Sequence, residues 1–562
     1  MSRKVLVGLL LIAVSLVFSA KAQQYAFQVT FTDKNNTPYS LSVPSAYLSP
    51  RALQRRANQG ITIDSTDIPV NPAYVDSVLV LTGGKLHGTS RWLNICMVLI
   101  ASADSAQILA LSGKPFINDI KLVGYYDPDL QRIAHTDSTA KATGTHTQKK
   151  TTSDESYYMD TWAQTALVNG NYLSDNGYKG QNMLIAVLDA GFIGTDTHPG
   201  FDSMWQAGRM IDTFNFVYDN TGVFSQDDHG TEVLSTMAAY VPATFVGSAP
   251  LAQYALYVTE YDPNDQPLEL DNMICAAERA DSIGADVITE SLGYDLFLNP
   301  ADGQVFSELD GKTTVAAQAA NIATKKGILF VATAGNDGTP VPGWGDHILT
   351  PGDADSALTI GAVDNTGTPA SFSGYGPNAI GRIKPDVSGM GVSTAIFNYS
   401  GGYTTGDGTS FSTPQIAGWA ACLWQTNRNA TPYQIRQAII TCASQYTNPG
   451  DQIGYGVPNF ECTEESLNVN DPVLDFTLAH WVFATPDPFN DELTLSVSPD
   501  TNGLIRFLLY DMSGKEVMTM NQYFYKGYNT PVTLSVTLMP AGIYILNVVS
   551  STQSQVIKLE KY

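Results

Sequence analysis

Three segments of the chain carry side chains that together could perform nucleophilic catalysis. Asp189 directly follows an apolar run, MLIAVL, and His229 lies in DDHGTEV, just before an apolar helical stretch. Ser410 lies in GDGTSFSTPQIAG, where Pro414 suits the first turn of a helix. A serine becomes a strong nucleophile when a histidine takes its proton, and a carboxylate that orients the imidazole completes such a triad.

A fourth segment, ATAGNDG, supplies a side-chain amide. Asn336 stands in a glycine-flanked loop behind an apolar run, so its amide could donate to the oxyanion that forms in acyl transfer. The backbone N–H of Ser410, at a helix N-terminus, could be the second donor. Taken singly, these residues have ordinary interpretations: a capping Asp, a structural His, an Asn turn and a helix-capping Ser. It is their combination that favours catalysis.

The chain between about residues 157 and 470 must position these groups. Apolar runs alternate there with helical stretches such as 271–284 and 314–327. The runs are 183–188, 254–258, 286–289, 328–333 and 358–363. This alternation predicts an α/β fold with a doubly wound parallel sheet, covered by helices on both faces. Such sheets present reactive groups at the carboxyl ends of their strands, where Asp189 and Asn336 would lie.

The motifs AVLDAGF, DDHGTEV, ATAGNDG and GDGTSFSTPQIAG resemble those of the subtilisin-like serine peptidases, in the same order along the chain. The resemblance implies a subtilisin-like fold over about residues 165–460. It also implies a serine endopeptidase that acts on protein or peptide substrates through an acyl-enzyme intermediate. In that case Asp189, His229 and Ser410 form the catalytic triad, and Asn336 helps to bind the oxyanion.

The same resemblance implies a substrate-binding segment and bears on cofactor and metal binding. ESLG resembles the family's substrate-binding strand, so Ser291, Leu292 and Gly293 are expected to pair with the substrate backbone. No cofactor is expected for the chemistry. Family members often bind structural calcium, which stays open for this chain; we name no metal ligand, because no EF-hand spacing is present. Departures from the family pattern, such as Glu232 and the sequence TSFSTPQ, affect pocket shape and remove no catalytic group.

The first residues have the pattern of an export signal. Arg3 and Lys4 precede an apolar run of 14 residues and a small-residue cleavage site, which predicts a signal peptide over residues 1–22. The apolar run is shorter than the roughly 20 residues that span a bilayer. We therefore expect no transmembrane segment and a secreted or cell-surface protein.

Residues 23–150 are predicted to form a separate α+β domain. Strands are expected at 25–31, 77–81 and 94–100, and a short basic helix at 47–60. By position and size the domain resembles the inhibitory propeptide of secreted subtilisin-like enzymes. A permanent accessory domain is the alternative. Cleavage that releases a propeptide is expected at about residues 135–157, a polar stretch of linker composition.

Residues 486–562 are predicted to form an all-β sandwich, with strands at 504–511, 532–538 and 543–549. The segments PDPFNDELTLSV, LYDMSGKEV and MPAGIYILNVVSS resemble the C-terminal sorting domain of proteins exported by the type IX secretion route. The resemblance implies the secretion machinery as a partner and an outer-membrane route to the surface or the medium. A carbohydrate- or protein-binding sandwich is the alternative.

Charge and cysteine content limit the remaining choices. The net charge of −24 argues against nucleic acid as a partner, because phosphate binding needs a basic surface. Residues 1–150 carry +6 and the rest −30, which favours docking of one part on the other. Cys442 and Cys462 could pair in an oxidising compartment, or could remain separate buried thiols. The rival to a secreted, self-inhibited peptidase is a catalytically silent binding protein on the same fold; an esterase is disfavoured because Ser410 lacks a G-x-S-x-G motif.

Overall fold

The computed structural model describes residues 24–101, 104–126, 153–260, 266–294, 305–338, 348–468, 482–485, 489, 492–497, 502–512, 514–524, 530–537, 539–552 and 554–561. The chain divides into two compact units, Met1–Val469 and Asn470–Tyr562. The predicted signal peptide and most of the predicted cleavage region lie outside the described residues.

The first unit is built on a seven-stranded sheet in which all neighbouring strands run parallel. In spatial order the strands are β13 (Val387–Met390), β12 (Leu358–Val363), β11 (Leu329–Thr333), β10 (Val287–Glu290), β5 (Leu184–Asp189), β9 (Gln253–Val258) and β6 (Met210–Asn215). The five strands expected from apolar runs are present. The structure adds the edge strands β6 and β13, whose sequences are polar or contain glycine and so gave no apolar run.

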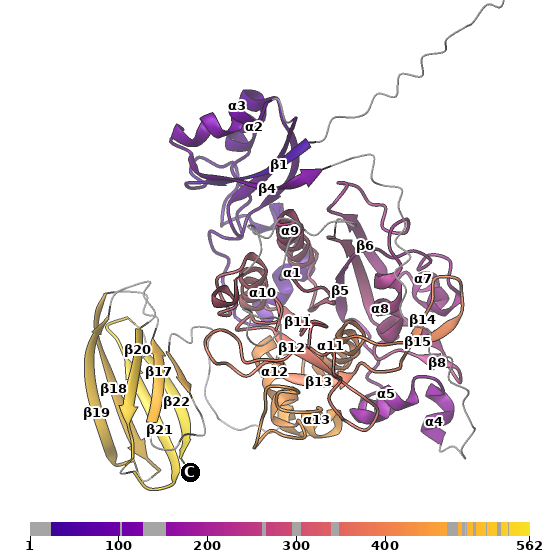
Figure 1. Cartoon of the computed structure of the whole chain (residues 1–562), viewed down its shortest axis with the longest axis vertical. Helices are drawn as coiled ribbons and strands as arrows, with labels where there is room; N and C mark the ends of the chain where they lie inside the picture. Colours follow the sequence, from indigo (N-terminus) through magenta and orange to yellow (C-terminus); the bar gives the residue numbers. More distant parts are fainter. Residues whose placement is uncertain are drawn as a thin grey trace, which may run out of the picture. The chain divides into compact units, whose positions relative to one another are not determined.

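Helices cover both faces of this sheet. Figure 1 shows α8 (His229–Ala238) and α11 (Thr409–Thr426) on one side, with α9 (Leu268–Ile283) and α10 (Val315–Lys325) on the other. Successive strand residues enter the two apolar cores alternately. Burial on both faces explains why the strands read as continuous apolar runs, and it confirms the doubly wound α/β fold.

The remaining elements of the catalytic part surround the sheet. They are α4 (Ser153–Tyr158), α5 (Trp162–Leu167), α6 (Gly170–Asp175), α7 (Asp202–Gln206), β7 (Tyr240–Val241), β8 (Phe245–Val246), β14 (Thr394–Phe397), β15 (Tyr403–Gly406), α12 (Pro432–Thr441) and α13 (Phe460–Asn468). Cys442, at the end of α12, forms a disulfide with Cys462 in α13. Of the two alternatives for this pair, the structure therefore shows the bonded one.

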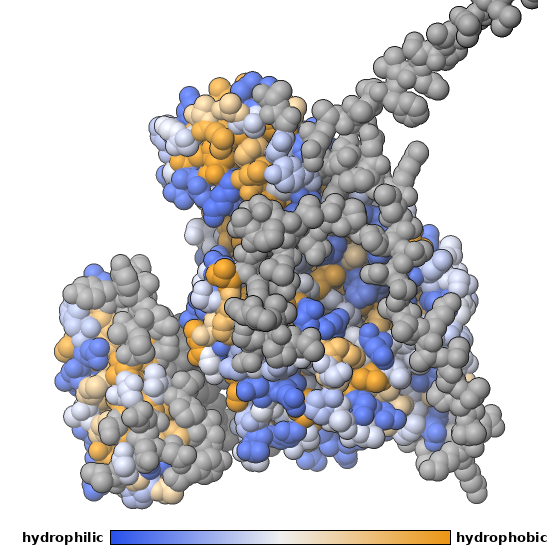
Figure 2. All heavy atoms as spheres, in the orientation of Figure 1, coloured by the Kyte–Doolittle hydropathy of each residue, from blue (hydrophilic) through white to orange (hydrophobic). Residues whose placement is uncertain are grey.

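The N-terminal domain is an antiparallel four-stranded sheet with helices, so the α+β prediction is confirmed. Its elements are β1 (Gln24–Phe31), α1 (Pro50–Asn58), α2 (Pro72–Thr82), β2 (Lys85–Ser90), β3 (Ile95–Ala101), α3 (Ser105–Leu109) and β4 (Ile117–Tyr126). In Figure 2, hydrophobic residues also gather on the outside of this domain, where Val80 of α2 is 82 % exposed.

One expected strand of this domain is wrong, because residues 77–81 lie in α2. Asn71 caps the start of that helix by accepting from the Ala73 N–H, and Pro72 occupies its first position. Gly83 ends it in a left-handed conformation with φ +64. The β-branched sequence SVLVL favours a strand, but these end signals and the packing of Val75 and Val78 outweigh that preference.

The N-terminal domain packs on α9 and α10 through charged side chains that are buried. Asp281 of α9 is fully buried and forms ion pairs with Arg55, with Arg56 at 2.8 Å and with Arg91 at 2.9 Å. At the end of α10, Lys326 lies 2.8 Å from Asp67. The three guanidiniums hold the pKa of Asp281 below its usual value, although burial alone would raise it.

The second unit is a sandwich of two antiparallel sheets, as predicted. One sheet contains β16 (Val482–Thr485), β17 (Glu492–Val497) and β20 (Thr530–Ser535), and the other β19 (Glu516–Phe524), β18 (Gly503–Asp511), β21 (Gly542–Val549) and β22 (Ser554–Lys561). Leu495 from the first sheet and Phe507 and Leu546 from the second meet in one apolar core.

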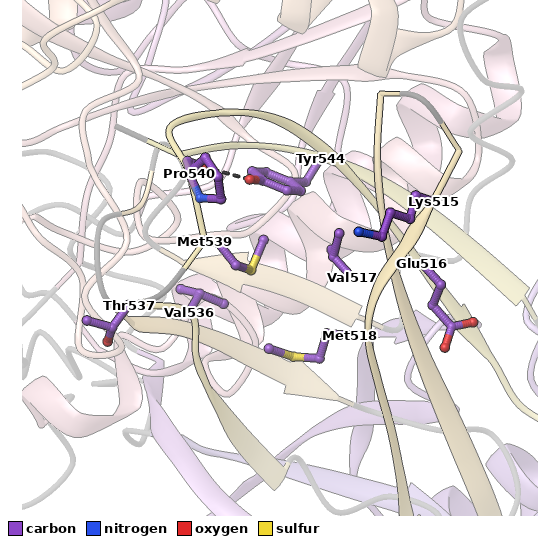
Figure 3. A pocket seen from close by; sticks show the side chains of 9 residues that line it. All are labelled: Lys515, Glu516, Val517, Met518, Val536, Thr537, Met539, Pro540 and Tyr544. Carbon is purple, nitrogen blue, oxygen red and sulfur yellow. Dashed lines mark hydrogen bonds between the residues drawn. The ribbon is translucent and has the colours of Figure 1, made fainter.

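A pocket of about 600 Å³ opens in this sandwich (Figure 3). It is lined by Lys515, Glu516, Val517, Met518, Val536, Thr537, Met539, Pro540 and Tyr544. The Tyr544 hydroxyl donates to the Pro540 carbonyl oxygen at 2.7 Å. The lining contains no Ser, Cys or His. Among the described residues, no helix is both long enough and apolar enough to cross a membrane.

Candidate active site

Asp189 and His229 meet at the carboxyl edge of the sheet. Asp189 is the last residue of β5 and is fully buried, and its Oδ1 lies 2.7 Å from Nδ1 of His229. His229 is the first residue of α8, where its backbone N–H donates to Asp227 Oδ1 at 2.7 Å. Since Nδ1 faces the carboxylate, Nε2 is left to face a reacting group.

The charges around His229 change its proton affinity. Burial lowers the pKa of the imidazole, but the Asp189 carboxylate and its hydrogen bond raise it more. Asp227 and Glu232 add to the rise, and the pKa of His229 reaches about 9. Burial in turn raises the pKa of Glu232 to about 7. Glu232, where the sequence departs from the family pattern, thus raises the pKa of His229 and leaves the hydrogen bond between His229 and Asp189 intact.

Ser410 is the second residue of α11, and the sequence places it there through close packing. Gly418 on the same helix lies against Ser248, where a methyl group built on the glycine would come 2.0 Å from Ser248 Oγ. The Ser410 side chain donates to the Ser291 carbonyl oxygen at 3.1 Å, and Ser291 Oγ donates back to the Ser410 carbonyl at 3.0 Å. These two bonds tie the serine to the segment that follows β10.

No hydrogen bond joins Ser410 to His229 in the described part of the chain, and the contact with the imidazole that the structure shows comes from Phe411. The rings of His229 and Phe411, the residue after Ser410, have centroids 6.1 Å apart. Because the Ser410 hydroxyl donates to the Ser291 carbonyl oxygen, it would have to give up that bond to donate to Nε2 of His229. Such contacts are often loose in enzymes without substrate.

Asn336 follows β11 and has its amide orientation fixed by a neighbour of the serine. Its Oδ1 accepts from the Thr409 N–H at 2.9 Å and from Thr409 Oγ1 at 2.7 Å. A backbone N–H can only donate, so the acceptor must be the amide oxygen and the NH₂ group points elsewhere. Thr409 is fully buried and accepts from Thr333 Oγ1 at 2.7 Å. Sequence reasoning missed Thr409; its place directly before Ser410 was the available signal.

Leu292 and Gly293 continue the segment after Ser291 and are partly exposed. Their backbone groups make no hydrogen bond within the described part of the chain, whereas Tyr294 pairs again with Thr350. Leu292 and Gly293 thus follow Ser291, which bonds Ser410, as a short backbone stretch without hydrogen bonds among the described residues. Such a stretch can accept a peptide as an added strand.

Comparison with protein families gives matches to three parts of the chain. Residues 180–456 match the subtilase family, Peptidase S8. Residues 26–141 match the Peptidase S8 propeptide domain of Bacteroidota, and residues 484–561 match the secretion system C-terminal sorting domain. Residues 180–456 are a subtilase domain. The protein is a subtilisin-like serine endopeptidase with a propeptide, and its sorting domain indicates type IX secretion to the cell surface or extracellular space.

Individual relatives agree with this assignment. Subtilisin DY of Bacillus licheniformis is 29 % identical over 291 residues, which cover 52 % of this chain and 93 % of that protein. The thermophilic serine proteinase of Bacillus sp. (strain AK1) is 32 % identical over 282 residues, covering 50 % of this chain and 60 % of the relative. The structure of the epidermin leader peptide processing serine protease from Staphylococcus aureus is similar in fold, with a TM-score of 0.54, 17 % identity, and coverage of 80 % of this chain and 99 % of that one.

Metal binding by the subtilase domain finds no support in the geometry. Among the described residues, no group of three or more His, Cys, Asp and Glu is arranged to hold a metal ion. No step of the chemistry is derived through a metal ion. Subtilisins need no cofactor for catalysis.

A buried glutamate lies beneath the substrate segment of the subtilase domain. Glu290, the last residue of β10, is fully buried, and neither of its carboxyl oxygens has a hydrogen-bond partner among the described residues. Burial raises the pKa of Glu290 well above its usual value, and nearby Glu260 and Asp189 raise it further. The raised pKa favours the neutral form of Glu290, which reduces repulsion with Asp189.

Proposed function

We propose that Ser410 is the nucleophile, His229 the general base and acid, and Asp189 the group that orients the imidazole. The observation that carries this proposal is the 2.7 Å bond between Asp189 and His229 beside a serine at the N-terminus of α11. Asn336 and the Ser410 N–H are proposed as the oxyanion donors. Ser291, Leu292 and Gly293 are proposed to pair with the substrate backbone.

The proposed reaction begins when Ser410 Oγ attacks the scissile carbonyl carbon and His229 Nε2 takes the hydroxyl proton. The oxyanion of the tetrahedral intermediate is stabilised by the two donors. The C–N bond then breaks, and His229 gives its proton to the leaving amine. Water attacks the acyl-enzyme by the same path and restores Ser410. Because the pKa of His229 is about 9, the neutral base is the minority form at pH 7 and becomes more abundant toward alkaline pH.

The N-terminal domain, proposed here as residues 23–150, is released from a self-inhibited precursor by cleavage at about residues 135–157. The ion pairs on Asp281 support docking of this domain on the enzyme before release. Residues 157–470 would form the catalytic domain, and residues 486–562 would be recognised by the secretion machinery. A structural calcium ion stays a proposal from the family alone.

Digestion of a peptide library by the processed enzyme tests the proposal, with cleavage products read by mass spectrometry. Ser410→Ala should lower the rate by about 10⁶-fold and abolish labelling by a fluorophosphonate. Ser412→Ala is the matched control, because its hydroxyl is buried and donates to the Thr409 carbonyl oxygen at 3.0 Å. A processed wild type that neither cleaves peptides nor takes the label would favour a silent binding protein instead.

A further inference from the structure

The side chain of Leu349 fills the space between the two backbone segments that flank the proposed nucleophile. A methyl group built on Gly335 would lie 2.6 Å from both Cγ and Cδ1 of Leu349. One built on Gly293 would lie 2.9 Å from the same Cδ1. Leu349 is 7 % exposed. Both glycines therefore face one leucine, which separates the segment after β10 from the segment after β11.

If Ser410 and Asn336 act as proposed, this space lies beside the substrate residue before the scissile bond, the P1 residue. The scissile carbonyl has to lie between Ser410 Oγ and the amide of Asn336. Its residue then runs beside Gly293 on one side and Gly335 on the other, because β10 and β11 are neighbours in the sheet. In an extended peptide, successive side chains point to opposite sides. One of these two sides is the space between the two glycines, which Leu349 fills.

Leu349 is held in this position by the backbone on both sides of it. Its N–H donates to the Ala334 carbonyl oxygen at 3.3 Å. The next residue, Thr350, exchanges two backbone hydrogen bonds with Tyr294, at 2.9 and 3.3 Å. Thr350 is fully buried, and its hydroxyl bonds that of Thr314 at 2.6 Å. A large P1 side chain would have to displace a packed leucine from this frame, and packed interiors resist such insertions.

We propose that Leu349 closes the P1 site, so that the enzyme cleaves after glycine, alanine and serine and discriminates against large apolar and aromatic residues. The proposal rests on the roles proposed for Ser410 and Asn336 and adds the substrate class. A single methylene in an apolar pocket already changes kcat/KM by about 10- to 200-fold. An alanine at P1 should therefore exceed a phenylalanine at P1 by at least about 100-fold.

The test uses the processed enzyme and a series of peptide p-nitroanilides that differ only at P1, with fluorophosphonate labelling to count active sites. Wild type should hydrolyse the glycine, alanine and serine substrates and be at least about 100-fold slower on phenylalanine and leucine. A labelled wild type that cleaves after phenylalanine within tenfold of alanine overturns this inference and leaves Ser410 in place. A wild type that takes no label overturns the assignment of Ser410, and this inference with it.

Two variants locate the effect. Leu349→Ala should raise kcat/KM for the phenylalanine substrate, relative to that for the alanine substrate, by about 100-fold. Ile348→Ala is the matched control, because Ile348 is also buried, next to Leu349, while the atoms nearest to both glycines belong to Leu349. If Leu349→Ala fails to fold, the P1 preferences of Leu349→Val and of the wild type test the proposal instead. A labelled Leu349→Ala enzyme that still rejects phenylalanine would contradict the role of Leu349.

Discussion

The N-terminal domain and the C-terminal sandwich bury their sheets in different ways. The sandwich places two sheets face to face, so each supplies the other's apolar cover. The N-terminal domain has one sheet, and only one of its faces is covered by its own helices. The other face, with Met97 and Leu99, packs against Leu268 and Cys275 of α9. The sandwich is thus complete by itself, whereas the N-terminal domain is completed by the enzyme.

The two regions also differ in the groups that they bury. The sandwich core is apolar, while the contact between the N-terminal domain and α9 contains three guanidiniums around Asp281. A buried ion pair adds little net stability, but a missing partner is strongly destabilising. Such a contact is specific, and both surfaces are charged once they separate. This suits a part that must leave the enzyme, while an apolar core suits a part that must stay folded.

The largest expected effect is seen when the two regions are made as separate fragments. Residues 478–562 should unfold cooperatively in urea, because their core needs no other part of the chain. Residues 24–126 should show no cooperative transition alone, since half of their sheet would face water. Near-ultraviolet circular dichroism during urea titration measures both. Adding the enzyme without its N-terminal domain should restore the signal of residues 24–126; a cooperative transition of that fragment alone would contradict the comparison.

The next effect concerns the buried charge that joins the N-terminal domain to the enzyme. Asp281→Asn leaves Arg55, Arg56 and Arg91 without their shared carboxylate. Loss of one partner in a buried pair costs about 3–5 kcal/mol, so the affinity of the N-terminal domain added in trans should fall at least about 10²-fold. Calorimetric titration gives the affinity. Asp212→Asn is the control, since Asp212 bonds Arg279 within the catalytic domain; an equal loss there would show a general effect of charge on α9.

The same contact contains two groups whose pH effects oppose each other. Burial raises the pKa of Asp271 to about 7 while Gln28 donates to it at 2.7 Å. Released, Asp271 would return to about 3.9, so its contribution to binding falls tenfold per pH unit as pH rises from about 4 to 7. Burial lowers the pKa of His87, which lies 3.0 Å from Asn272. A released His87 takes a proton below about pH 6.5, so its contribution falls as pH falls.

These slopes have opposite signs in the wild type between about pH 5 and 6.5. Asp271→Asn removes one of them, so binding of the N-terminal domain should strengthen from pH 5.5 to 6.5, by at most about fivefold. His87→Gln should leave the opposite slope, with binding that weakens as pH rises. Titrations at half-unit pH steps measure both variants against the wild type. Parallel curves for all three proteins would mean that neither group titrates in the contact.

The positions of the candidate site residues in the fold could be predicted from the sequence, because they depend on local signals. Apolar runs gave the strands, and the residues at their carboxyl ends, Asp189 and Asn336, lie at the predicted edge of the sheet. Contacts between distant segments could not be predicted. Thr409 fixes the Asn336 amide across 73 positions of the chain, and Leu349 fills a space that two separate strand ends create. The wrong strand at 77–81 has a similar cause, since tertiary packing decides between helix and strand for such a sequence.

The smallest expected effect is that of salt, which distinguishes buried ion pairs from the long-range attraction between the oppositely charged N-terminal domain and enzyme. Exposed charges are screened beyond about 10 Å at 0.1 M salt, whereas buried pairs are screened much less. Raising sodium chloride from 0.1 to 1 M should therefore slow association of the N-terminal domain but change its dissociation rate by less than about threefold. Stopped-flow mixing and dilution measure the two rates. Faster dissociation in salt, by tenfold or more, would show that exposed charges supply most of the binding energy. The ion pairs of Asp281 would then fix the orientation of the N-terminal domain without contributing much to its affinity.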